Sequence, residues 1–171
     1  MRTAFYPCCG KDYEYPSRLL SGLVDRIVFC DIRPQCAEQL ARYKGHIGSV
    51  AVEFVAGDVR EVIERMNNIE VFFYRGDSRG EGGSGVYVLG KKFFDNLARH
   101  LIDGALIITD GHNSGDKLFQ RMIRPEGYVR FGKYYSPKSG VPQPNTDGLY
   151  TIQVNDVGGQ KNASGLDIAA V

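Results

Sequence analysis

The chain has 171 residues and a formal net charge of +1, and hydrophobic residues make up 43% and charged residues 24% of it, values that are typical of one globular domain with a sizeable core. The balanced charge gives no reason to expect nucleic acid or a membrane surface as a partner, and no stretch approaches the roughly 18 apolar residues of a membrane span. The N-terminus has no apolar segment long enough for a secretory signal, so we expect a cytoplasmic protein.

Short apolar runs alternate with helical patterns along the chain. The run "DRIVFCD", residues 25–31, is rich in β-branched and aromatic residues and lacks polar alternation. Such a run is typical of a strand that is buried on both faces of a parallel sheet. Five strands of this kind are predicted, at residues 3–6, 25–31, 52–58, 69–77 and 105–110.

Helical spacing follows each of these strands except the first. Pro34 suits the first position of a helix, and apolar residues continue behind it with helical spacing to Tyr43. Val59, Val62, Ile63 and Met66 stand at i, i+3, i+4 and i+7, which places them on one buried helix face. Two further helices are predicted, one from residue 93 that ends at Gly104 and a poorer one at 114–123.

The C-terminal third has a different pattern. Two strands are predicted at residues 128–136 and 149–154, and a loop with three prolines separates them. A loop of about a dozen residues favours an antiparallel pair over a parallel crossover. The predicted fold class is therefore α/β: a doubly wound, mostly parallel seven-stranded sheet with helices on both faces and an antiparallel C-terminal strand pair. The predicted domain covers residues 1–156, and residues 157–171 form a polar tail.

The four cysteines, Cys8, Cys9, Cys30 and Cys36, raise the question of a metal or disulfide site. They form no C-x-x-C pair and do not match the Cys/His spacing of zinc sites. In a reducing compartment such residues are small, mostly buried thiols. We expect no metal site.

Acids follow the predicted strands at the edge where doubly wound sheets bind ligands. Asp31 is the most informative of them, because it lies 21 residues after Gly10. This interval matches the distance between a glycine turn and the acid that binds a ribose hydroxyl pair. A helix-capping role fits Asp31 less well, because Pro34 at the first helical position would make Arg33 the cap.

The other acids keep two interpretations each. Asp58 and Glu61 form a D-x-x-E pattern that resembles a capping box, although Asp58 could also bind the exocyclic amine of a base, and the two roles can coexist. Asp12, Asp77 and Asp110 fit either turn positions or a ligand site.

Residues 1 to about 156 resemble the class I S-adenosylmethionine-dependent methyltransferases in element order, in the antiparallel end of the sheet and in the placement of these acids. The resemblance implies that "YPCCGKD", residues 6–12, is the cofactor loop, with Asp12 near the cofactor's ammonium group. It also implies that Asp31 holds the ribose hydroxyls, that Asp58 meets the adenine amine and that residues 75–78 face the methyl group.

The resemblance implies an S-adenosylmethionine-binding protein that methylates a small molecule or an acceptor delivered by a protein partner. A general base is needed only when the acceptor atom carries a proton to be removed. The candidate base is Asp77, with His112 behind it. The cofactor-binding residues implied are Tyr6, Pro7, Cys8, Cys9, Gly10, Asp12, Asp31, Ile32, Asp58, Val59, Arg75 and Gly76.

Two alternatives stay open. A nicotinamide-dependent oxidoreductase fits the interval from Gly10 to Asp31, but the chain lacks the G-x-G-x-x-G that brings backbone amides close to a pyrophosphate. A non-catalytic domain of methyltransferase type fits the loop after the first strand, which keeps only Gly10 among the expected glycines.

Overall fold

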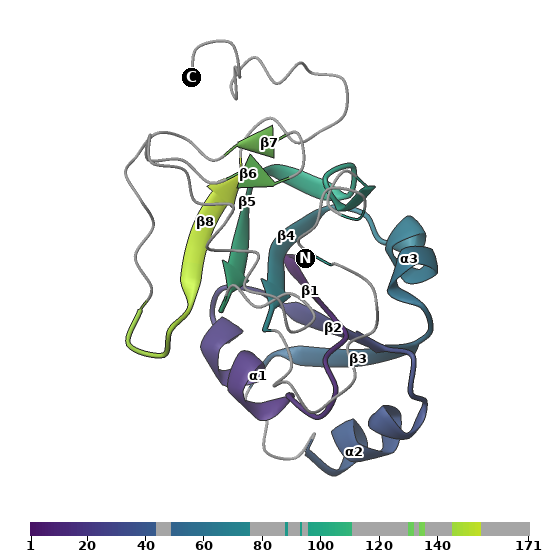
Figure 1. The fold of residues 1–171 in the computed structure, drawn as a ribbon. Helices are drawn as coiled ribbons and strands as arrows, with labels where there is room; N and C mark the ends of the chain where they lie inside the picture. Colours follow the sequence, from purple (N-terminus) through teal and green to yellow (C-terminus); the bar gives the residue numbers. More distant parts are fainter. Residues whose placement is uncertain are drawn as a thin grey trace.

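The computed structural model describes residues 1–43, 49–75, 88, 93, 96–110 and 145–153, together with the backbone of 130–131, 134–135 and 154. Its centre is a six-stranded sheet in the order β3-β2-β1-β4-β5-β8 (Figure 1). The strands are β1 (Thr3–Pro7), β2 (Arg26–Asp31), β3 (Ala51–Ala56), β4 (Ile69–Tyr74), β5 (Leu101–Thr109) and β8 (Tyr150–Val154). The described helices are α1 (Glu14–Leu20), α2 (Gln35–Tyr43), α3 (Val59–Val62) and the 3₁₀ turn η2 (Ile63–Arg65).

The first five strands of the sheet are parallel, which confirms the α/β prediction. The chain moves outward from β1 through β2 to β3 and then returns to the other side of β1 with β4 and β5. The strand order therefore reverses between β1 and β4. In open α/β sheets the loops at such a reversal form a crevice at the carboxyl edge, which is where ligands bind.

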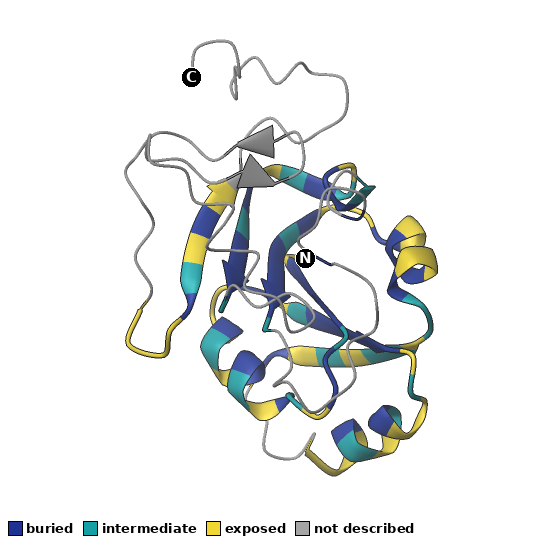
Figure 2. Cartoon of the chain, viewed as in Figure 1, coloured by how far each residue is buried: buried dark blue, intermediate teal, exposed yellow. Residues whose placement is uncertain are grey.

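The core lies on the central strands. All five residues of β1 are buried, and Phe72 and Phe73 of β4 are fully buried, whereas the edge strand β3 alternates between exposed and half-buried residues (Figure 2). The rings of Phe5 and Phe72 pack across β1 and β4 with centroids 6.3 Å apart. Continuous apolar runs therefore mark the central strands, because both faces of a parallel sheet are covered.

Helix α1 was not predicted. Its sequence, "EYPSRLL", contains Pro16 at the third helical position. Proline is tolerated there because the N–H groups of the first turn have no intrahelical acceptor. Pro16, Ser17 and Leu20 of this short helix are buried, as is its N-cap residue Tyr13, so its stability comes from tertiary packing.

The boundaries around β5 differ from the prediction. Gly104 was expected to end a helix, but it lies inside β5 with a φ of +80°. Ile69 of β4 pairs with Leu101 of β5, and Val71 of β4 pairs with Leu106 of β5. Over this stretch β5 therefore has more residues than β4. Glycine accommodates such a bulge without side-chain strain. The helix predicted over 59–66 is also shorter than expected, because α3 tightens into η2 after Val62.

The predicted seven-stranded sheet is not confirmed, because the main sheet has six strands among the described residues. The predicted strand at 128–136 contains two short strands, β6 (Arg130–Phe131) and β7 (Tyr134–Tyr135), which pair with each other outside the main sheet. The antiparallel strand of the main sheet is β8, and its partner is β5. The coverage of both sheet faces by helices stays a prediction. Among the described residues, no helix has the length and apolar character of a membrane span.

Candidate functional site

The loop after β1 lies at the carboxyl edge beside the reversal of strand order. Cys8 and Gly10 both have left-handed backbone, with φ values of +53° and +56°. This conformation disfavours a residue with a Cβ by roughly 1–2 kcal/mol, so Cys8 holds a position that glycine would adopt more readily. The N–H of Cys9 donates to the carbonyl of Cys30 over 3.1 Å, which ties the loop to β2.

Asp31 is the last residue of β2, and its carboxylate links the end of β2 to the loop after β1. Its side chain is 5% exposed, and its Oδ2 accepts the N–H of Gly10 over 2.9 Å. Oδ1 accepts the backbone N–H of Arg33 over 2.9 Å. The Arg33 guanidinium adds Nε–H to Oδ1 over 2.9 Å and Nη2–H to Oδ2 over 3.2 Å. Each carboxylate oxygen therefore has one backbone donor and one guanidinium donor.

These donors decide the charge of Asp31. Burial would by itself raise the pKa of this carboxyl, but the hydrogen bonds from the side chain and backbone of Arg33 and from the backbone of Gly10 outweigh burial and lower the pKa. Asp31 is therefore an anion near neutral pH although it is almost fully buried. The sequence analysis did not foresee the role of Arg33, although the spacing Asp-x-Arg is visible in the sequence.

Asp58 repeats this arrangement at the end of the next strand. It is the N-cap of α3, and its Oδ1 accepts the backbone N–H of Arg60 over 2.9 Å. The Arg60 guanidinium binds both carboxylate oxygens, and its side-chain hydrogen bond is the main reason that the pKa of Asp58 is lowered. The capping role that the sequence left open for Asp58 is thus present. Its predicted contact with an adenine amine stays a prediction.

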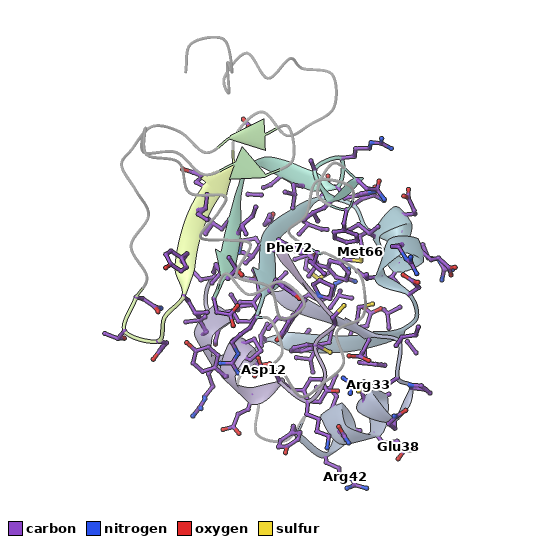
Figure 3. All side chains as sticks on the ribbon, viewed as in Figure 1. Asp12, Arg33, Glu38, Arg42, Met66 and Phe72 are labelled. Atoms are coloured by element: carbon purple, nitrogen blue, oxygen red, sulfur yellow. The ribbon has the colours of Figure 1, made fainter. Side chains whose placement is uncertain are left out.

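A second cluster gathers around Asp12, which Figure 3 labels near the ends of β1 and β4. Asp12 Oδ1 accepts Nη2–H of Arg75 over 2.7 Å, and Oδ2 accepts the hydroxyl of Tyr6 over 3.0 Å. The Arg75 guanidinium also lies 4.7 Å from the centroid of the Tyr15 ring, and the Tyr15 hydroxyl donates to Asp147 over 2.7 Å. Segments from β1, α1, β4 and the turn before β8 therefore meet here.

Burial and the hydrogen-bonded neighbours of Asp12 shift its pKa in opposite directions. Burial raises the pKa of Asp12, and this effect exceeds the lowering by Arg75 and Tyr6. Hydrogen bonding to Asp147 adds to burial and raises the pKa of Tyr15 to about 12. Sequence reasoning named Asp12, Tyr6 and Arg75 but missed Asp147, because nothing in the sequence shows that the turn before β8 reaches α1.

The residues that directly follow Asp31 and Asp58 differ in their exposure to solvent. Ile32, next to the buried Asp31, is 68% exposed, which is unusual for a large apolar side chain at a sheet edge. Val59, next to Asp58, is 3% exposed and belongs to the core. Tyr6 and Pro7 are also buried. Gly76, Asp77 and His112 lie outside the described residues.

None of the four cysteines near this edge forms a disulfide. Burial raises the pKa of Cys9 well above its usual range and raises the pKa of Cys30 to about 12. Both thiols are therefore protonated near neutral pH and are poor nucleophiles and metal ligands. Within the described part of the chain, no group of three or more His, Cys, Asp or Glu residues could hold a metal ion.

The lowered pKa of Asp31 predicts a loss of stability in acid. A carboxyl whose pKa is lower in the folded than in the unfolded state stabilises the fold above the unfolded value, about 3.9, and this contribution is lost as pH falls through the folded pKa. We expect the free energy of unfolding, measured by urea denaturation between pH 6 and 2.5, to fall more steeply in the wild type than in Asp31→Asn. Glu38→Gln, at an exposed position of α2, is the control, and equal slopes for wild type and Asp31→Asn would contradict the prediction.

No protein-family model matches the sequence, and no curated protein matches it either. Among solved structures, a methyltransferase from Geobacter sulfurreducens aligns with a TM-score of 0.56 and 15% identity over 90% of this chain and 70% of that one. TrmN from Thermus thermophilus aligns with a TM-score of 0.52 and 13% identity over 90% of this chain and 43% of that one.

A spermidine synthase in complex with the transition-state analogue AdoDATO aligns with a TM-score of 0.53 and 12% identity over 90% of this chain and 54% of that one. The chain thus spans less than two thirds of the length of TrmN and of this synthase. Identities this low show likeness of fold alone. The resemblance inferred from the sequence is confirmed at that level: the chain has the Rossmann-like fold of the class I S-adenosylmethionine-dependent methyltransferases.

Proposed function

We propose that this protein binds S-adenosylmethionine and transfers its methyl group to a small molecule or to an acceptor delivered by a protein partner. The observation that carries the proposal is the hydrogen bond from Gly10 to Asp31. It joins a left-handed glycine loop after β1 to a buried, ionised acid at the end of β2. Both lie beside the reversal of strand order, where this class of sheet binds nucleosides.

The residues at this edge fit the chemical groups of the cofactor. Asp31 is an anion that can accept hydrogen bonds from a vicinal diol, and the exposed Ile32 beside it offers an apolar surface to a base. Asp12 and Arg75 present opposite charges, which complement the ammonium and carboxylate of an amino-acid end. The predicted roles of Asp58 toward the adenine amine and of Gly76 toward the cofactor belong to the same proposal.

Methyl transfer needs little from the protein beyond alignment. The bound sulfonium supplies the reactive methyl group, so the chain's own residues must hold the two reactants in line, exclude water and remove a proton where the acceptor carries one. Asp77, two residues beyond Arg75, is the proposed base. The structural neighbours include a spermidine synthase as well as a methyltransferase, so the fold alone does not choose the reaction.

The start of α1 speaks against the nicotinamide alternative. A pyrophosphate needs free backbone N–H groups and a positive helix end. Here Glu14 occupies the first turn of α1, and Asp12 lies just before the helix. These carboxylates would compete with a pyrophosphate for the helix end, where Arg75 and Arg18 already pair with them.

Calorimetry with the purified protein tests the proposal. S-adenosylhomocysteine should bind with a dissociation constant in the micromolar range, which corresponds to about −8 kcal/mol, and NAD should give no heat. Heat with NAD but not with S-adenosylmethionine or S-adenosylhomocysteine would refute the proposal. Binding without transfer of labelled methyl to any acceptor in a cell extract would instead assign a non-catalytic domain.

A further inference from the structure

The carboxylate of Asp31 has no acceptor position left for a ligand. An ionised carboxylate offers about four acceptor positions, two on each oxygen. The N–H groups of Gly10 and Arg33 take one position on each oxygen, and the Arg33 guanidinium takes the other two. A ribose diol that binds Asp31 therefore has to replace existing donors.

The backbone donors and the guanidinium donors differ in how easily they can move away from the Asp31 carboxylate. The N–H of Gly10 is held in place because the preceding residue, Cys9, donates a hydrogen bond to Cys30 of β2. The N–H of Arg33 lies two residues after Asp31 in a tight turn. The Arg33 side chain is 40% exposed, so its guanidinium can turn into solvent. Figure 3 shows Arg33 at the edge near α2, away from the packed side chains around Phe72.

The guanidinium also matches a vicinal diol in its pattern of donors. It places one N–H on Oδ1 and one on Oδ2, as two neighbouring hydroxyls would. If it leaves, each oxygen keeps one backbone donor and regains one open position. The carboxylate would remain held in place and ready to accept a diol.

We propose that the Arg33 guanidinium occupies the ribose-binding positions of Asp31 in the free protein and must swing out when a nucleoside binds, so that Arg33 weakens and tunes cofactor affinity. This inference rests on the proposed function, because it takes Asp31 as the ribose acceptor. In this view Arg33 competes with the ribose for Asp31 and so lowers the affinity for the cofactor. Its position is set by the Asp-x-Arg spacing, which recurs with the same contacts at Asp58 and Arg60.

Calorimetric titration of Arg33→Ala with S-adenosylhomocysteine tests the inference. When the competent state is only partly populated, the apparent affinity is reduced by that fraction, so removal of the competitor should tighten binding by about threefold to tenfold. The gain should disappear with the 2′,3′-dideoxy analogue, which has no diol to donate to Asp31. Arg33→Met, which keeps most of the aliphatic stem, should behave like Arg33→Ala.

Arg2→Ala is the matched control. Arg2 also pairs with an aspartate, Asp25, but it precedes β1 and so lies at the opposite edge of the sheet. Its loss should leave affinity unchanged. Thermal melting of each variant establishes that it is folded at the temperature of the titration.

The outcomes separate the two proposals. Wild-type binding without a gain in either Arg33 variant, or with an equal gain for both ligands, overturns the role of Arg33 and leaves the proposed function intact. Weaker binding in both Arg33 variants also overturns it, because Arg33 would then contact the ligand directly. If neither the wild type nor the variants bind S-adenosylhomocysteine, the proposed function fails and this inference with it.

Discussion

Replacing Asp31 by asparagine is expected to weaken the binding of S-adenosylhomocysteine at least about tenfold, or 1.4 kcal/mol. The substitution keeps the size of the side chain but turns one acceptor oxygen into a donor. That donor must face the N–H of Gly10 or the donors of Arg33 at one of the two former oxygen positions. The same conflict should lower the free energy of unfolding by about 1–3 kcal/mol.

Calorimetry well below the melting temperature separates the two effects, and urea denaturation measures the second. Glu38→Gln, an exposed change on α2 that also removes one negative charge, is the control for charge. It should change neither quantity appreciably. A folded Asp31→Asn protein with wild-type affinity would show that the ribose acceptor is misassigned.

Replacing Phe72 by alanine is expected to lower the free energy of unfolding by about 3–5 kcal/mol. Phe72 lies on β4 between Phe5 of β1 and Ile107 of β5, and all three side chains are fully buried. Neighbouring strands surround the site on both sides, so the sheet cannot close the cavity that the missing ring leaves. This loss is a large part of the 5–15 kcal/mol that stabilises a typical domain.

Urea denaturation of Phe72→Ala checks this expectation, with Leu23→Ala as the control. Leu23 is 45% exposed, in the loop between α1 and β2, so its truncation should change stability by less than about 0.5 kcal/mol. Equal losses in the two variants would mean that β4 is not at the centre of the core.

The parallel part of the sheet could be predicted from the sequence because its signal is local. Buried strands require continuous apolar runs, and the runs at "DRIVFCD" and at Ile69–Tyr74 have few polar interruptions. The acids that follow these runs stand where the strands end, so Asp31 could be placed at the carboxyl edge before any coordinates were known. Its assignment to a ribose stays a prediction.

The sequence by itself therefore determined the succession of strands and helices in the α/β units and the edge of the sheet at which Asp12, Asp31 and Asp58 lie. Only the tertiary structure decided that β8 pairs with β5, that Gly104 lies in a bulge and that Arg75 binds Asp12. The physical reason is the separation along the chain of the residues that interact. Hydrophobic periodicity acts between near neighbours in the chain, whereas sheet pairing and ion pairs such as that between Asp12 and Arg75 join segments that are brought together only when the core packs.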